Sequence, residues 1–144
     1  GGVSGFVFSR CPFSLVGVRV VGPLTVGQRR VVVLRVTPFE KVGARLMVDD
    51  PLPAGIEIDN PTLIRSGDVR GLDWLSPAPV QHVEFRSDRF LAAVDQRGAD
   101  TFELAYIARA VSPGTFHHPA ALVEDMYRAE YRAVTATGET VVAE

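Results

Sequence analysis

Five consecutive residues near the end of the chain combine side chains that seldom share one environment. Glu124, Asp125, Met126, Tyr127 and Arg128 bring together two carboxylates, a thioether, a phenol and a guanidinium. They cannot all face a hydrophobic core, so at least two must point outward on a bend or loop. A thioether beside a phenol forms a small apolar patch suited to docking. The segment therefore predicts a contact surface.

Two roles are open for the carboxylates of this segment. Glu124 and Asp125 either lie on a solvated bend or orient the loop through Arg128 or Arg132. They are adjacent in the chain rather than opposed across a cleft, and the pair Asp49-Asp50 has the same arrangement. Neither pair therefore indicates acid-base catalysis.

The remaining chemically capable residues form no catalytic pattern. His117 and His118 are adjacent, and neighbours on an extended segment point to opposite faces, which argues against one shared metal or substrate. His82 is isolated, and no His-x-x-x-His or Cys-x-x-Cys spacing supports a zinc site. The chain also lacks a Gly-x-Ser-x-Gly elbow and a glycine-rich phosphate loop. The sequence predicts a protein that is not an enzyme and needs no metal or cofactor.

The composition is typical of one domain with a full hydrophobic core. The 144 residues are 47% hydrophobic and 22% charged, and a chain of this length buries about two-thirds of its unfolded surface. The net charge is −2 with both signs interspersed. Because there is no basic stripe of the kind that phosphate backbones need, we expect no nucleic-acid partner.

Cys11 is the only cysteine. It excludes an internal disulfide and a site built from cysteines alone, and its apolar surroundings favour a small packed side chain over a reactive thiol. No run of eighteen apolar residues occurs in the sequence. No amino-terminal export signal precedes the first expected strand. If the parent protein is exported, we expect its address to lie upstream.

An alternation with a period of two runs through the chain and predicts β-strands. The clearest strand-length runs cover residues 29–37, 44–48 and 101–109, and turn signals such as Asp50-Pro51 and Ser112-Pro113-Gly114 separate them. We therefore expect an all-β fold, an antiparallel immunoglobulin-like β-sandwich.

Two local features refine this expectation. The alternation over 85–95 predicts a hairpin with Ser87-Asp88 at its turn. In the run 101–109, the four side chains that share one face are expected to point into the core: Phe102, Leu104, Tyr106 and Ala108.

One short helix is expected over Asp68–Leu75, with Ser66 or Asp68 as its N-cap and Pro77 ending it. Within it, Trp74 carries an indole N–H that needs a partner if it is buried. The same holds for the hydroxyl of Tyr106.

The segment VEDMYR, with AYIARAVSPGTFHHPA before it and YRAVTATG after it, resembles the carboxy-terminal macroglobulin-like domain, the MG10 type, of bacterial alpha-2-macroglobulins. The blocks VVVLRVTPFE, DDPLPAGIEIDNP, RSGDVRGLDWL and VEFRSDRFLAAVD are similar to that family in the same order. Several ordered blocks over residues 31–138 are more specific than a lone motif. The resemblance implies that residues 1–144 form a single macroglobulin-like domain at the carboxy-terminal end of a larger chain.

The resemblance implies a protective function for the contact surface. Such proteins are proteinase inhibitors that trap an attacking proteinase through a buried thioester, as part of bacterial defence. The family's carboxy-terminal domain places a Met-Tyr-Arg loop over that thioester, which implies that Met126, Tyr127 and Arg128 shield it from water. The thioester itself is not in this chain, because Cys11 is followed by Pro12-Phe13-Ser14 instead of the family's glutamate-glutamine pair.

The neighbours of the Met-Tyr-Arg triplet would support the loop. Glu124 and Asp125 precede it, and Ala129 follows it where the family's pattern continues with proline. Because proline fixes φ, its replacement predicts a less stiff loop in this chain.

The resemblance also implies partners and a location. The expected partners are the thioester domain and neighbouring domains of the same parent chain, trapped proteinases indirectly, and a penicillin-binding protein. The expected compartment is the periplasm, with the parent anchored to the inner membrane through a lipidated amino terminus. The alternative is a free-standing immunoglobulin-like adhesion or carbohydrate-binding module, which would have a similar fold.

Overall fold

Strands make up all of the regular structure in the part of the chain that the computed structural model describes. That part comprises residues 5–39, 42–65, 68–76 and 79–144, with the backbone alone at 42–44 and 97. The strands are β1 (Phe6–Phe13), β2 (Leu24–Thr25), β3 (Arg29–Pro38), β4 (Val42–Pro51), β5 (Ile56–Asp59), β6 (Val80–Phe85), β7 (Arg89–Gly98), β8 (Phe102–Ala110), β9 (Gly114–His118), β10 (Leu122–Asp125), β11 (Arg132–Val134) and β12 (Gly138–Ala143). Of these, β3 and β4 extend the predicted runs 29–37 and 44–48, and β8 is displaced by one residue from the predicted run 101–109.

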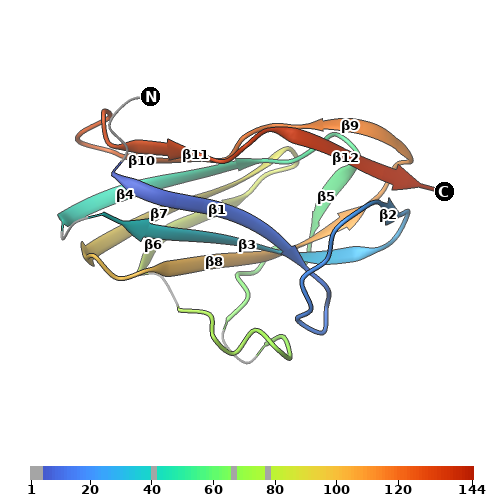
Figure 1. Ribbon diagram of the computed structural model, residues 1–144, viewed down its shortest axis with the longest axis horizontal. Helices are drawn as coiled ribbons and strands as arrows, with labels where there is room; N and C mark the ends of the chain where they lie inside the picture. The colour runs from blue at the N-terminus through green and yellow to red at the C-terminus, as the bar shows by residue number, and fades with distance from the viewer. Residues whose placement is uncertain (1–4, 40–41, 66–67, 77–78) are drawn as a thin grey trace.

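The strands form three sheets (Figure 1). Their strand orders are β1-β3-β8-β5, β11-β10-β4-β7-β6 and β2-β12-β9. Neighbouring strands are antiparallel except β2 and β12, which are parallel. The hairpin β10-β11 lies at one end of the long axis, and β2, β9 and β12 lie at the other (Figure 1).

The main core lies between the four-stranded and five-stranded sheets. Phe102, Leu104, Tyr106 and Ala108 of β8 all belong to it, as their shared face predicts. The ring of Phe90, from β7, stacks on that of Tyr106 with centroids 4.9 Å apart, which joins the two sheets. The predicted antiparallel β-sandwich is thus confirmed.

The predicted hairpin is also confirmed. Strands β6 and β7 pair with Phe85 opposite Phe90, and the Arg86 N–H donates to the Arg89 carbonyl at 2.9 Å. Ser87 and Asp88 are the exposed residues at its tip.

The predicted helix over Asp68–Leu75 is wrong. This stretch forms successive turns, and no helix occurs in the described residues. Gly71 has a φ of +84°, in the left-handed region that a right-handed helix cannot continue through. The proposed cap Ser66 and stop Pro77 lie outside the described residues.

These turns cover the second face of the four-stranded sheet. Val69, Leu72 and Leu75 recur every third residue and pack with Val31 and Val33 of β3 in a smaller hydrophobic cluster. The Leu72 N–H donates to the Val69 carbonyl (3.1 Å) and the Leu75 N–H to the Leu72 carbonyl (3.3 Å). A spacing of three therefore reflects stacked turns here, and the part of the sheet beneath these turns is buried on both faces.

Candidate functional site

The predicted contact surface lies on the loop that joins β10 to β11. Strand β10 pairs with β4 on one side and β11 on the other, so the paired strands hold both ends of the segment. Residues 126–131, which we call the 126–131 loop, project from this end of the five-stranded sheet (Figure 1).

The buried Asp125 carboxylate holds the loop in place through hydrogen bonds. Its side chain is 2% exposed. One carboxylate oxygen, Oδ1, accepts the backbone N–H groups of Tyr127 (2.9 Å) and Arg128 (3.1 Å). The other, Oδ2, accepts Nε (3.3 Å) and Nη2 (3.2 Å) of Arg128. A buried carboxylate with four donors is a satisfied anion, and it fixes the path of the backbone.

Arg128 folds back over its own loop. In addition to its pairing with Asp125, its guanidinium lies 4.7 Å from the centre of the Tyr131 ring. This is the geometry of a cation-π contact. Two internal partners therefore occupy the Arg128 side chain.

Backbone hydrogen bonds close the loop. The Met126 N–H donates to the carbonyl of Arg45 in β4 (2.9 Å), and the Tyr131 N–H donates to the Arg128 carbonyl (2.9 Å). The second bond closes a four-residue turn with Ala129 at its second position, where proline is favoured in type I and II turns. The position that departs from the family's pattern is thus one where proline would suit the turn.

Met126 and Tyr127 are the large apolar side chains that the loop presents to solvent, next to the exposed Ala129 and Glu130. Met126 is 47% exposed and Tyr127 is 78% exposed. Glu124 lies beside the loop and pairs with Arg132 at 3.8 Å. Of the two roles open for the carboxylates, these contacts correspond to orientation of the segment through Arg128 and Arg132. The shielding role of the loop stays a prediction.

The residues considered for catalysis do not converge in the described part of the chain. His117 is exposed and His118 is partly buried on β9, as opposite faces require. His82, on β6, contacts Glu84 at 3.0 Å. No group of three or more metal-ligating side chains is found among the described residues.

His118 gives the stability of the domain a pH dependence. Burial, with the nearby positive charges of Arg10 and His117, lowers the pKa of His118 to about 4. The folded state therefore keeps this histidine neutral while the unfolded chain takes up a proton below its ordinary pKa of about 6.5. Stability from this group is present above pH 6.5 and is lost as pH falls towards 4.

We expect His118→Gln to remove this component of acid sensitivity. Urea unfolding at pH 7.5 and pH 4.5 measures it. The exposed His117→Gln, which removes only the smallest of the three causes of the shift, should change the acid sensitivity less than His118→Gln does. An undiminished loss of stability in His118→Gln between the two pH values would contradict the assignment.

A buried polar cluster joins the sheets and was not predicted from the sequence. Arg10 of β1 donates to Asp50 of β4 at 2.6 Å and to the Pro119 carbonyl at 2.8 Å. The hydroxyl of Tyr106 donates to the other Asp50 oxygen. Burial raises the pKa of the Asp50 carboxyl, and Arg10 and Tyr106 oppose that rise. Tyr106 thus has the buried partner that its hydroxyl needs.

Trp74 is not buried, so its indole N–H does not require a partner within the protein. The residue is 40% exposed. The Arg35 guanidinium lies 4.9 Å from the centre of the Trp74 ring, and the Phe13 and Trp74 ring centres are 5.6 Å apart. Cys11 is partly buried on β1, close to these groups in a small hollow.

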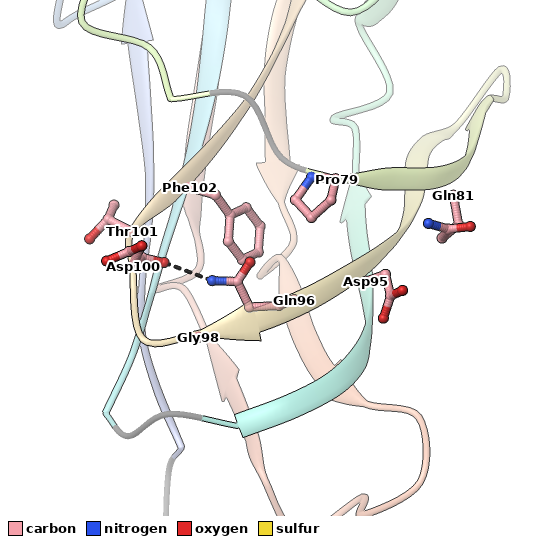
Figure 2. A pocket seen from close by; sticks show the side chains of 8 residues that line it. All are labelled: Pro79, Gln81, Asp95, Gln96, Gly98, Asp100, Thr101 and Phe102. Atoms are coloured by element: carbon pink, nitrogen blue, oxygen red, sulfur yellow. Dashed lines mark hydrogen bonds between the residues drawn. The ribbon is translucent and has the colours of Figure 1, made fainter.

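A separate polar hollow of about 510 Å³ lies at the ends of β7 and β8 (Figure 2). Gln96 reaches across it and donates a hydrogen bond to the Asp100 carbonyl at 2.9 Å. Phe102 and Pro79 also line it. Among the described residues that line the hollow, the polar groups form no catalytic or metal-binding arrangement.

No helix long and apolar enough to cross a membrane is present in the described ranges.

Comparison with known families gives one clear match. The model of the bacterial alpha-2-macroglobulin MG10 domain matches residues 5–130. Among curated proteins, the alpha-2-macroglobulin of Xylella fastidiosa strain 9a5c is 40% identical over 119 residues, which cover 77% of this chain and 7% of that protein. The alpha-2-macroglobulin of Escherichia coli K12 is 38% identical over 105 residues, which cover 67% of this chain and 6% of that protein.

Solved structures agree with the sequence match. Native Escherichia coli alpha-2-macroglobulin, from domain MG7 to the C-terminus, has a TM-score of 0.84 at 31% identity, covering 98% of this chain and 24% of that one. Salmonella alpha-2-macroglobulin reacted with methylamine has a TM-score of 0.85 at 34% identity, covering 98% and 9%. The pilin SpaD of Corynebacterium diphtheriae, at 10% identity and a TM-score of 0.55, shares only the fold.

The chain spans only 6–7% of the two curated relatives, so it corresponds to a domain of those proteins. The adhesion-module alternative rests on fold likeness alone, whereas the MG10 model covers most of the chain. This chain belongs to the bacterial alpha-2-macroglobulin MG10 domain family.

Proposed function

We propose that this domain shields the thioester of a parent alpha-2-macroglobulin, with the 126–131 loop as its lid. The parent would be a proteinase trap, and the partner would be the thioester domain of the same chain. The observation that carries the proposal is the loop itself: Met126 and Tyr127 are 47% and 78% exposed on a backbone that a buried carboxylate holds in place.

The chemistry of a thioester explains the need for a lid. Water or a primary amine attacks its carbonyl carbon, a carboxylic acid or amide forms, and the cysteine thiol is released. An apolar and an aromatic side chain laid over the bond exclude water from it. Met126 and Tyr127 have the side-chain types that this task requires.

Relatives support an inhibitory role. Salmonella alpha-2-macroglobulin has been reacted with methylamine, and the Escherichia coli protein has been activated by porcine elastase. We infer that proteinases also activate the parent of this chain and that the lid leaves when the domains rearrange. The domain contributes no catalytic group of its own to this role.

The wider setting is part of the same proposal. We propose that residues 1–144 form one domain at the carboxy-terminal end of the parent, that the parent acts in the periplasm from an inner-membrane lipid anchor, and that it works beside a penicillin-binding protein in defence. Fractionation of cells that express the tagged parent tests the compartment.

Oxidative footprinting tests whether the loop is covered in the parent. We expect hydroxyl radicals to modify Met126 and Tyr127 readily in the 144-residue chain and several-fold more slowly in the native full-length parent. Treatment of the parent with proteinase should restore the fast rate. Exposed Trp74, on other turns, is the internal reference. Equal modification of Tyr127 in the chain and in the native parent would contradict the proposal.

A further inference from the structure

We propose that Asp125 is a positioning residue that preforms the lid and turns Arg128 inward, so that the loop docks as a rigid unit through Met126 and Tyr127. This inference rests on the proposed function, and it assigns Arg128 a contact within the loop in place of one with the thioester domain. The group formed by Asp125, Arg128 and Tyr131 is called the loop clamp below.

The Asp125 carboxylate divides its hydrogen bonds between the backbone and a side chain of the loop. Oδ1 accepts two successive backbone N–H groups, of Tyr127 and Arg128, which fixes the backbone that carries the Tyr127 ring. Oδ2 accepts two nitrogens of the Arg128 side chain. One carboxylate therefore holds both the backbone of the lid and its charged side chain.

Asp125 and Arg128 differ in burial, and the carboxylate is the buried partner. The Asp125 side chain is 2% exposed, and that of Arg128 is 43% exposed. If Arg128 swung out to contact another domain, the Asp125 carboxylate would lose its cation in a place that water barely reaches. Arg128 would also lose its contact with the Tyr131 ring, whose centre lies 4.7 Å from the guanidinium. Arg128 is thus better bonded inward than outward.

Backbone hydrogen bonds anchor the loop to the five-stranded sheet. Asp125 ends β10 and pairs with Leu46 of β4, its N–H donates to the Tyr131 carbonyl (3.0 Å), and the Met126 N–H donates to the Arg45 carbonyl (2.9 Å). A loop fixed in its bound form gives up less conformational entropy on docking. It can also leave the thioester without unfolding.

The loop clamp makes a prediction about proteolysis. The Arg128-Ala129 peptide bond is exposed and has the chemistry that trypsin cleaves, but a proteinase requires an extended segment. The turn closed by the Tyr131 N–H and the Arg128 carbonyl holds the bond in a bent form. Opening the loop clamp must therefore precede cleavage.

Trypsin digestion of the 144-residue chain tests the clamp directly. We expect Asp125→Ala to raise the rate of cleavage after Arg128 about tenfold or more, since a charge-assisted hydrogen bond is lost. Cleavage after Arg70, in other exposed turns, is the internal reference, and Asp88→Ala, at the exposed tip of the β6-β7 hairpin, is the matched control. A urea unfolding curve establishes that each variant is folded. Unchanged cleavage after Arg128 in folded Asp125→Ala would overturn the proposal.

Methylamine incorporation in the full-length parent tests the positioning role. We expect Asp125→Ala to speed incorporation, and Asp125→Ala/Tyr127→Ala to react more slowly than the product of the two single effects, because part of the Asp125 effect acts through the position of Tyr127. Independent, fully multiplicative effects would mean that Asp125 does not position Tyr127, and would overturn the positioning role.

The two proposals can fail separately. If Tyr127→Ala leaves the rate of methylamine incorporation unchanged, the shielding function is wrong, while the trypsin result still decides whether the loop clamp exists. If Tyr127→Ala reacts fast and Arg128→Ala speeds the reaction further in the Asp125→Ala background, Arg128 contacts the partner directly and the inward assignment is wrong.

Discussion

Asp50→Ala should lower the free energy of unfolding of the domain by about 3–5 kcal/mol, the usual cost of removing one partner of a buried ion pair. Side-chain exposure is 8% for Arg10 and 0% for Asp50. The substitution would leave the Arg10 guanidinium without its carboxylate and the Tyr106 hydroxyl without its acceptor. Such a loss is a large part of the roughly 5–15 kcal/mol that stabilises a typical domain.

Asp49 supplies the matched control, since it is the next residue on β4. It pairs with Arg89 at 3.0 Å, but the two side chains are 26% and 35% exposed. Asp49→Ala should cost only about 0.2–1 kcal/mol, as exposed pairs do. The midpoint of urea unfolding, at constant slope, measures both. Similar costs for the two variants would contradict the inter-sheet role of Asp50.

The Arg10→Met variant tests the Arg10–Asp50 ion pair through the pH dependence of the domain's stability. Burial already raises the pKa of the Asp50 carboxyl, and loss of the opposing guanidinium would raise it further. A carboxyl whose pKa is raised in the folded state contributes stability below its unfolded pKa of about 3.9. This contribution is lost as the pH rises through the folded pKa. Arg10→Met should therefore be more destabilising at pH 7 than at pH 4, relative to the wild type.

The sequence predicts the sandwich because its strands alternate strongly. In β8, the residues of one parity are the large apolar ones, and that parity faces the main core. The opposite parity is misleading, since Glu103 and Ala105 are also buried, at 7% and 1%. A covering layer of turns from far along the chain buries them, and a strand's own pattern contains no information about such a layer.

The role of Asp50 could not be predicted for a similar reason. Asp49 and Asp50 read as equivalent carboxylates, and only the pleat of β4 sends one outward to Arg89 and the other inward to Arg10 and Tyr106. The signal available in the sequence was the polar atom of Tyr106, which needs a partner if it is buried. Identifying that partner requires the packing of two sheets.

The exposure of the Met126-Tyr127 segment was predictable from residue types. An exposed Met126 and Tyr127 follow from five side chains that cannot share a core. The inward direction of Arg128 was not, because a guanidinium beside a tyrosine reads equally well as an outward anchor. The carboxylate three residues earlier is the deciding group.

Tyr127→Ala should raise the rate at which small amines label the thioester of the full-length parent by about 10- to 100-fold. Burying an aromatic side chain against a partner is worth about 1.5–3 kcal/mol, and each 1.4 kcal/mol changes the open fraction of a lid tenfold. The substitution should scarcely affect the stability of the domain, because Tyr127 is 78% exposed and surface changes usually lie within about 0.5 kcal/mol.

Tyr127→Phe is the matched control for this effect. It keeps the ring and removes the hydroxyl, so a lid that works by excluding water should remain nearly as protective as the wild type. Labelling of Tyr127→Phe as fast as Tyr127→Ala would show that the hydroxyl, rather than the ring, carries the protection.

The most direct test is the rate of methylamine incorporation into the full-length parent, followed by mass spectrometry for the wild type and Tyr127→Ala. A lid predicts slow labelling of the wild type, fast labelling of the variant, and fast labelling of both after proteinase treatment. Equal slow labelling of the two before proteinase treatment would contradict the shielding role. No labelling of either protein after proteinase would show that the parent has no reactive thioester for this domain to protect.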